Sequence, residues 1–516
     1  MPTTGHRPDT DGATLLRNRA HDYVYVQNNS RHLRFTGTTA WFDWAVASSG
    51  ADRAVYPLLR ADSRARRLLR RLDNEVRMER ARLLPGLSPM VMSATDAASA
   101  EMLLRRLLTR VDDPVARRRL ARAWRAGGSS RWPAAVGILD ELAELRRSAA
   151  RAAGAACPAD VSRLEDGTLP SADEVTAFVE SYACDATTRH QLFVEALGAV
   201  GDDHDALTNY PVYVRQRVAG GPSPQLHVAR AVELAARIIG TCLDGPIGTA
   251  WFADHVLLSL CDHEGLPVGH VQLDLSLGGR TVCADSLVGS PVGRVLIRCA
   301  PSGTGPIMSY EAFFLFVHEI GHALTHVLRS AQSVYRGPWA GLTYGPVLHT
   351  ESVSTLIEKV ALHPDLASWF RLANHERAAL SARQRLSALE FLRNEAVQVA
   401  VARADDQLHG PDARPVGTGG RTPVDACFPQ AWQVAPYIVT QLAARHPGVG
   451  AVAYLVANAY SCTVFKPLRD GSFGTCLSSI AAEIAGVLLA DRWPSPAIPA
   501  SGPVSAVYLP ALAEES

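Results

Sequence analysis

Apolar residues recur at helical spacing through most of the first 220 residues. Leu103 and Leu104, for example, are followed four residues later by Leu107 and Leu108 among arginines, a spacing typical of amphipathic helices. Residues 220–224 combine two glycines with two prolines and therefore act as a helix breaker. We expect four parts along the chain: a flexible tail (1–12), a helical N-terminal portion (13–220), a second portion with the candidate chemistry described below (221–495) and a Pro/Ala-rich tail (496–516).

The pattern changes from helical periods to short apolar runs between 252 and 300. Two runs, 256–260 and 271–275, flank Asp262, His263, Glu264 and Gly265, a turn-forming sequence that predicts a β-hairpin. A third run at 295–297 predicts another strand, and a mostly helical stretch follows, interrupted by a Gly/Pro-rich loop near 409–423. The expected fold class is therefore mainly α, with a small antiparallel β-sheet.

A strongly apolar helix is expected directly after this sheet. Ser309 can cap its N-terminus, and Glu311 in the first turn complements the helix dipole. The apolar positions that follow surround the helix and predict that it is buried; they are Phe313, Phe314, Phe316, Val317, Ile320, Leu324 and Val327.

This helix carries a His-Glu-x-x-His motif, His318-Glu319-Ile320-Gly321-His322. His318 and His322 are four residues apart and project from one face, where two neutral imidazoles can hold a metal ion. Glu319 lies one step round the helix, within reach of a water at that ion. A sequence with 17 histidines can contain this motif by chance. However, two histidines and a glutamate on a buried helix cost free energy unless they are paired or bind a metal ion. The motif therefore predicts a zinc site with one ion.

Hydrolytic zinc sites generally use three protein ligands, and the third must come from elsewhere. His326 lies eight residues from His318, roughly 12 Å along a helix, which is too far to share one ion. Residues 349–358 read as the start of a helix with Glu351 in its first turn, so Glu351 is either the third ligand or an ordinary helix-start acid. Glu358 falls on the same face and can hydrogen-bond a histidine ligand from behind.

Composition excludes several other classes of protein. Lys+Arg and Asp+Glu both total 51, which argues against nucleic acid or an anionic membrane as a partner. The nine cysteines are dispersed without a Cys-x-x-Cys pair, as in a reducing cytoplasm. The first residues do not resemble a signal peptide, and no apolar run approaches 18 residues. We therefore expect a cytoplasmic protein, and its scarcity of lysine is typical of a GC-rich bacterial genome.

Taken together, the landmarks between about 250 and 465 resemble the thimet oligopeptidase / oligopeptidase F family of zinc metallopeptidases, of the gluzincin type. The hairpin resembles the family's strand pair ahead of the active site, and His318 to Leu324 match its signature with Ile320 in place of the usual Phe. Glu351, Ser354 and Glu358 stand where the family has a Glu-x-Pro-Ser-Gln-x-x-Glu pattern. The resemblance implies a zincin-like oligopeptidase fold in which the helical portion forms one wall of a deep channel for short peptides. It also implies that Glu351 is the third ligand.

The sequence departs from the family in two places. Val353 and Thr355 replace the usual Pro and Gln. The family's later Gly/Tyr-rich loop, which stabilises the oxyanion, corresponds here to His446, Tyr454 and Tyr460, but other expected tyrosines are missing. The two tyrosines are therefore either catalytic donors or core aromatics of a helix.

Three functions agree with these observations. The first is a zinc-dependent endopeptidase for short peptides, with Glu319 as general base and Tyr460, Tyr454 or His446 as oxyanion donor. The second is a dedicated peptidase that processes one precursor in peptide natural-product biosynthesis. The third is a catalytically inactive relative that binds peptides.

Overall fold

The computed structural model describes short stretches between 113 and 189, then 224–277, 284–286, 292–336, 347–410 and 450–488, together with Val504, Val507 and Tyr508. The chain forms two compact units that interleave along the sequence, and the sheet and the candidate site belong to the unit formed by 101–122, 170–399 and 452–516. The expected division of the chain at residue 220 stays a prediction, because most residues before it lie outside the described ones.

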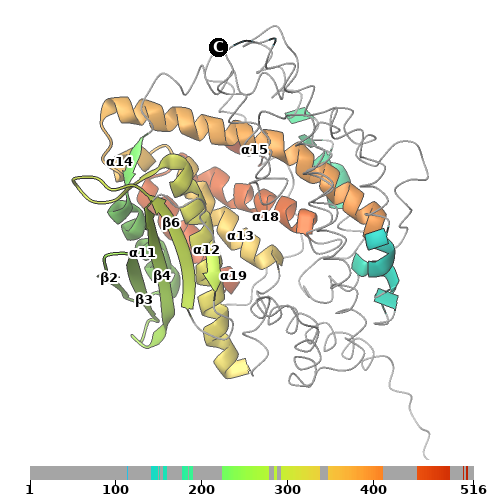
Figure 1. The fold of residues 1–516 in the computed structure, drawn as a ribbon, viewed down its shortest axis with the longest axis horizontal. Helices are drawn as coiled ribbons and strands as arrows, with labels where there is room; N and C mark the ends of the chain where they lie inside the picture. Colours follow the sequence, from blue (N-terminus) through green and yellow to red (C-terminus); the bar gives the residue numbers. More distant parts are fainter. Residues whose placement is uncertain are drawn as a thin grey trace, which may run out of the picture. The chain divides into compact units, whose positions relative to one another are not determined.

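Five strands form the main sheet, in the order β2-β3-β4-β6-β5 (Figure 1). They are β2 (Ile247–Trp251), β3 (His255–Cys261), β4 (Pro267–Leu277), β5 (Ala284–Ser286) and β6 (Val292–Cys299). β3 pairs antiparallel with both β2 and β4, but β4 and β6 run parallel. The predicted hairpin and third strand are confirmed, but the prediction that the sheet is antiparallel is wrong for the pairing of β4 with β6. Apolar runs carry no information on strand direction, which depends on the crossover between β4 and β6.

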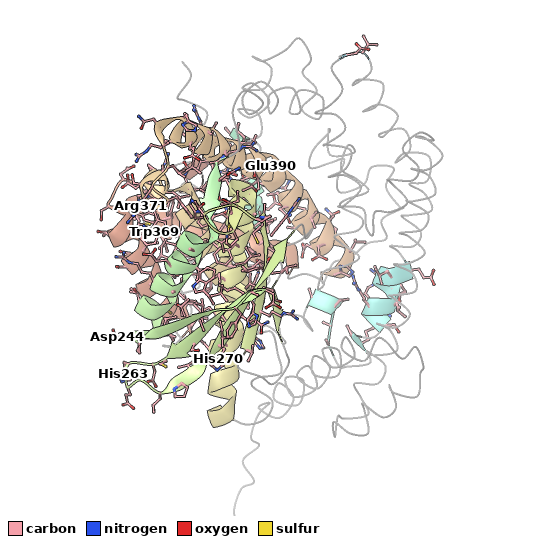
Figure 2. The ribbon with its side chains drawn as sticks, turned by 60° about the vertical axis from the view of Figure 1, so that its left-hand side comes forward. Asp244, His263, His270, Trp369, Arg371 and Glu390 are labelled. Atoms are coloured by element: carbon pink, nitrogen blue, oxygen red, sulfur yellow. The ribbon has the colours of Figure 1, made fainter. Side chains whose placement is uncertain are left out.

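The turn between β3 and β4 has the chemistry that its sequence predicts. Asp262 accepts hydrogen bonds through Oδ1 from the backbone N–H groups of Glu264 (3.0 Å) and Leu266 (2.9 Å). Gly265 adopts φ +77°, a left-handed conformation that a side chain would strain. His263 lies at the tip of this hairpin (Figure 2).

One face of the sheet packs against α12 (Tyr310–Arg336), which runs across β4 and β6 (Figure 1). The residues on this sheet face, each at most 1% exposed, are Val256, Leu258, Val271, Leu273, Val295 and Ile297. On the helix side the buried residues are Phe313, Phe316, Val317, Ile320 and Leu324. α12 begins where a short two-stranded sheet ends, formed by β1 (Gln225–His227) and β7 (Ile307–Ser309). Ser309 caps it as predicted, because its Oγ accepts a hydrogen bond from the Ala312 N–H at 3.2 Å.

Further helices follow along the chain, and α13 (Val347–Glu358) packs directly against α12. The others are α11 (Val228–Leu243), η4 (Lys359–Leu362), α14 (Leu366–Trp369), α15 (Asn374–His409), α18 (Gly450–Phe465), η6 (Lys466–Leu468) and α19 (Phe473–Leu488). The expectation of a mainly helical protein with a small sheet is thus confirmed. Among the described helices, we find none with the length and apolar character needed to cross a membrane.

The end of the chain contributes to the core. Val504, Val507 and Tyr508 are each at most 5% exposed, and the Tyr508 ring stacks on Phe391 of α15 with 4.0 Å between centroids. The expected Pro/Ala-rich tail over 496–516 stays a prediction, and within it these three positions are buried. Its Pro/Ala-rich composition hid apolar residues whose partners lie far away in sequence.

Candidate metal centre

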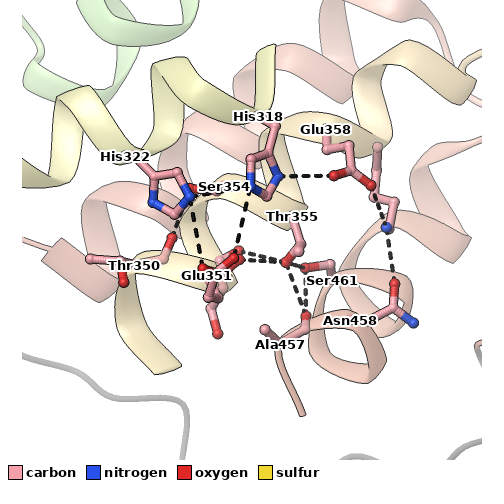
Figure 3. Close-up of polar contacts among 12 residues, drawn as sticks. His318, His322, Thr350, Glu351, Ser354, Thr355, Glu358, Ala457, Asn458 and Ser461 are labelled. Atoms are coloured by element: carbon pink, nitrogen blue, oxygen red, sulfur yellow. Dashed lines mark hydrogen bonds and ion pairs between the residues drawn. The ribbon is translucent and has the colours of Figure 1, made fainter. Parts of the chain in front are cut away.

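Two helices bring three potential ligands together (Figure 3). His318 and His322 of α12 approach each other to 3.2 Å between their Nε2 atoms. Glu351 of α13 lies opposite, with its carboxylate oxygens 3.8 Å from Nε2 of His318 and 3.9 Å from Nε2 of His322. One ligand atom from each of the three residues lies within 4.8 Å of the other two. His326, half-buried one turn further along α12, does not belong to this group.

Gly321 allows α13 to come this close to α12. A Cβ atom at this position would lie 2.5 Å from Cα of Ser354 and 2.9 Å from its backbone N. The hydroxyls along the interface are satisfied within their own helices, since Ser354 donates to the carbonyl of Thr350 at 2.8 Å and Thr325 to that of Gly321 at 2.8 Å. The two backbones can therefore pack without a layer of water between these groups, and Glu351 is carried toward the histidines.

The spacing of the three groups fits a zinc ion. Tetrahedral bonds of about 2.05 Å place two imidazole nitrogens roughly 3.3 Å apart, and the observed separation is 3.2 Å. The carboxylate is about 0.5 Å further from the nitrogens than such geometry needs, a gap that a small rotation of the Glu351 side chain closes. Two imidazoles and one carboxylate are also the donor set that catalytic zinc accepts.

Glu358, at the end of α13, holds His318 from the other side of its ring. Its Oε2 lies 2.9 Å from Nδ1 of His318, so Nδ1 donates to the carboxylate and Nε2 faces the other ligands. Burial opposes a charge on His318, but the hydrogen bond and the negative charge of Glu358 outweigh it and raise the pKa of His318 to about 9. Burial and then the positive charge of His318 lower the pKa of His322 to about 3. The electrostatic field at His318 therefore favours a positive charge at this position.

The remaining predicted site residues are placed differently. Glu319 is half-buried on α12, close enough for its charge to contribute to the raised pKa of His318. Tyr460 is a buried residue of α18, and its hydroxyl donates to Glu483 of α19, as expected if it is a core aromatic. Tyr454 is half-buried on the same helix, and His446 lies outside the described residues.

Sequence reasoning missed a polar cluster behind the ligands. Lys359 is fully buried beside Glu358, and its Nζ lies 3.0 Å from Oδ1 of Asn458 on α18. Nearby, Thr355 of α13 and Ser461 of α18 approach to 2.6 Å between their hydroxyl oxygens. A signal existed in the sequence: Lys359 is one of only two lysines and follows directly after a residue assigned to the site.

Comparisons with known proteins find a likeness in structure and no match in sequence. Neither a protein-family profile nor a curated protein sequence matches the chain. Among solved structures, PZ peptidase A with an inhibitor is similar at a TM-score of 0.52 and 14% identity, covering 96% of this chain and 85% of that one.

A protein from Bacillus anthracis strain Ames assigned as an oligoendopeptidase F gives a TM-score of 0.44 at 14% identity, covering 94% of this chain and 88% of that one. Only the similarity to PZ peptidase A is high enough to show a shared fold. The chain therefore has the fold of PZ peptidase A, and the resemblance to oligopeptidase F-type peptidases that its motifs indicated is confirmed at the level of the fold.

Proposed function

We propose that this protein is a zinc-dependent endopeptidase that hydrolyses peptide bonds in short peptides. The convergence of His318, His322 and Glu351 within 4.8 Å, with Glu319 beside them, is the observation that carries the proposal. The peptidase fold adds support, since PZ peptidase A has a similar structure. The deep substrate channel and the cytoplasmic location stay predictions.

His318, His322 and Glu351 would hold the ion, which supplies a Lewis acid for the scissile carbonyl and lowers the pKa of water. Glu319 then accepts a proton from the attacking water and passes it to the nitrogen of the leaving amine. Glu358 keeps Nε2 of His318 directed at the ion by accepting the hydrogen bond from Nδ1. These roles separate the groups that hold the ion from the one group that moves a proton.

An oxyanion donor completes the mechanism. Tyr460, Tyr454 and His446 were the three candidates from the sequence. Because the hydroxyl of Tyr460 donates to Glu483, Tyr454 and His446 are the candidate oxyanion donors to test first.

The substitution Glu319→Gln tests the mechanism because it removes the base and leaves all three ligands in place. Loss of general base catalysis lowers kcat by about 10²- to 10⁴-fold, while zinc content stays at one equivalent per chain. Glu233→Gln is the matched control, since Glu233 is an exposed residue of α11 that pairs with Arg230. Undiminished peptide turnover by Glu319→Gln would exclude the mechanism, and less than stoichiometric zinc in the wild type would favour the inactive peptide binder.

The range of substrates is a separate question. The hydroxyl of Tyr460 donates to Glu483 and not toward the three potential ligands, which argues against one donor of the general peptidase pattern and supports the dedicated precursor peptidase as a second candidate. Mass spectrometry of peptide-library digests, with and without a chelator, distinguishes the two. Broad chelator-sensitive cleavage supports a general oligopeptidase, whereas an inactive but zinc-loaded protein supports a dedicated substrate.

A further inference from the structure

The buried ammonium of Lys359 contacts the group that orients a metal ligand. Lys359 directly follows α13 and is 0% exposed. Its Nζ lies 3.4 Å from Oε1 of Glu358, while Oε2 of the same carboxylate bonds Nδ1 of His318. Each oxygen of Glu358 therefore has its own partner, and the carboxylate cannot rotate without losing one of them.

Residues from three other segments hold the ammonium in place. Asn458 of α18 accepts its hydrogen bond at 3.0 Å, and the same Asn458 oxygen accepts one from the Tyr508 hydroxyl at 3.2 Å. The ring centroids of Phe391 and Tyr508 lie 5.6 and 5.4 Å from Nζ. The two rings stack on each other with 4.0 Å between centroids. Because Nζ is nearly equidistant from both centroids, it lies beside the stack and not above the face of either ring. The rings therefore act mainly by excluding water from the cluster.

Stability alone does not account for this arrangement. Taking two charges out of water costs several kcal/mol, and replacing a buried ion pair by apolar groups is often neutral or stabilising. The choice of lysine is also specific, because this chain uses arginine for all but two of its 51 basic residues. The side chain of lysine ends in a compact ammonium, which acts as a point charge, whereas the planar guanidinium of arginine would need more space at this position.

We propose that Lys359 is a positioning residue of the metal centre, which holds the Glu358 carboxylate in the orientation that directs Nε2 of His318 at the ion. This inference rests on the proposed zinc site. The alternative is a purely structural role, in which Lys359 neutralises a buried acid and has no effect on the ion. The two roles differ in whether metal affinity responds to Lys359 through Glu358.

Zinc affinity of the full-length chain, measured by competition with a chromophoric chelator, is the primary readout, and the visible spectrum of the Co²⁺-loaded protein is the second. Lys359→Met removes the charge and keeps an unbranched side chain that is one atom shorter. We expect zinc to bind about 10- to 100-fold more weakly, as for other groups that orient a ligand, with a shifted Co²⁺ spectrum. Lys466→Met is the matched control, because Lys466 is the other lysine and is exposed on η6; it should match the wild type.

A double-mutant cycle shows whether Lys359 acts through Glu358. Glu358→Gln alone weakens zinc binding, and adding Lys359→Met to that variant should cause no further loss. Wild-type affinity in Lys359→Met, or losses that add in the double variant, would overturn the proposal.

If Lys359→Met does not fold, Asn458→Leu takes its place: more than about a threefold loss of affinity supports the proposal, and unchanged affinity overturns it. A wild type that binds no zinc overturns both this inference and the proposed function, whereas a zinc-loaded, active wild type with an unaffected Lys359→Met overturns this inference alone.

Discussion

Replacing Gly321 by alanine tests whether the contact between α12 and α13 builds the metal centre. The new Cβ would lie 2.5 Å from Cα of Ser354, whereas carbon atoms in contact lie about 3.5 Å apart. The helices must therefore separate by roughly 1 Å. Glu351 lies three residues from Ser354 on α13, so its carboxylate retreats from the histidines by a similar distance. Zinc–ligand distances tolerate only about 0.2 Å, and we expect zinc affinity to fall by about tenfold or more.

Stability and metal affinity should respond differently to this substitution. Alanine in place of a helical glycine contributes up to about 1 kcal/mol, while overpacking costs about 1–3 kcal/mol. The metal-free protein should therefore lose roughly 0–2 kcal/mol of unfolding free energy. Urea unfolding in the presence of a chelator measures this, and chelator competition measures the zinc affinity.

Gly486→Ala on α19 is the control, because no atom in the described part of the chain lies within 4 Å of a Cβ at that position. It should stabilise the protein by about 0.5–1 kcal/mol and leave zinc binding unchanged. If Gly321→Ala behaves like Gly486→Ala in both measurements, the close approach of the two helices does not position Glu351, and our account of the site is refuted.

Three further predictions concern other contacts in the structure. Because the pKa of His318 is raised to about 9, zinc must displace a proton at lower pH, so its affinity should fall about tenfold per pH unit from pH 8 to 6; a flat profile in chelator competition would contradict this. Tyr460→Phe should leave kcat within a few-fold and cost about 1 kcal/mol of stability, since its hydroxyl donates to Glu483; a loss of kcat above about 100-fold would instead identify Tyr460 as the oxyanion donor. Glu395→Gln breaks the buried pair in which Arg189 donates to both oxygens of Glu395 at 2.8 and 2.6 Å, and should lower the unfolding free energy by about 3–5 kcal/mol without changing zinc affinity; stability equal to the wild type would show that the pair contributes little.

Local patterns predicted the parts of this structure that depend on neighbours in sequence. The β3–β4 hairpin follows from short apolar runs on either side of Asp262 and Gly265, and the start of α12 follows from the cap at Ser309. The shared face of His318 and His322 follows from the helical period alone. In each case the interacting groups lie within a few residues of one another, so the local sequence is sufficient to predict the contact.

Features that depend on distant segments could not be read in this way. The parallel direction of β6 depends on a crossover, and the burial of Tyr508 depends on Phe391 of α15. Spacing left Glu351 undecided because its role depends on which helix packs at Gly321. Lys359 acquires its neighbours from three segments that no local pattern connects.

The proposed metal centre would join two helices that are separate along the chain. His322 and Glu351 are 29 residues apart, so an ion held by both closes a loop of about 30 residues, which in a chain-entropy treatment of cross-links corresponds to roughly 3.5 kcal/mol. Unlike a disulfide, this cross-link forms and opens with the free zinc concentration, because an ion that binds only the folded chain shifts the folding equilibrium by mass action. If the proposed zinc site is correct, a cell short of zinc would lose the protein by unfolding and degradation as well as by lost turnover.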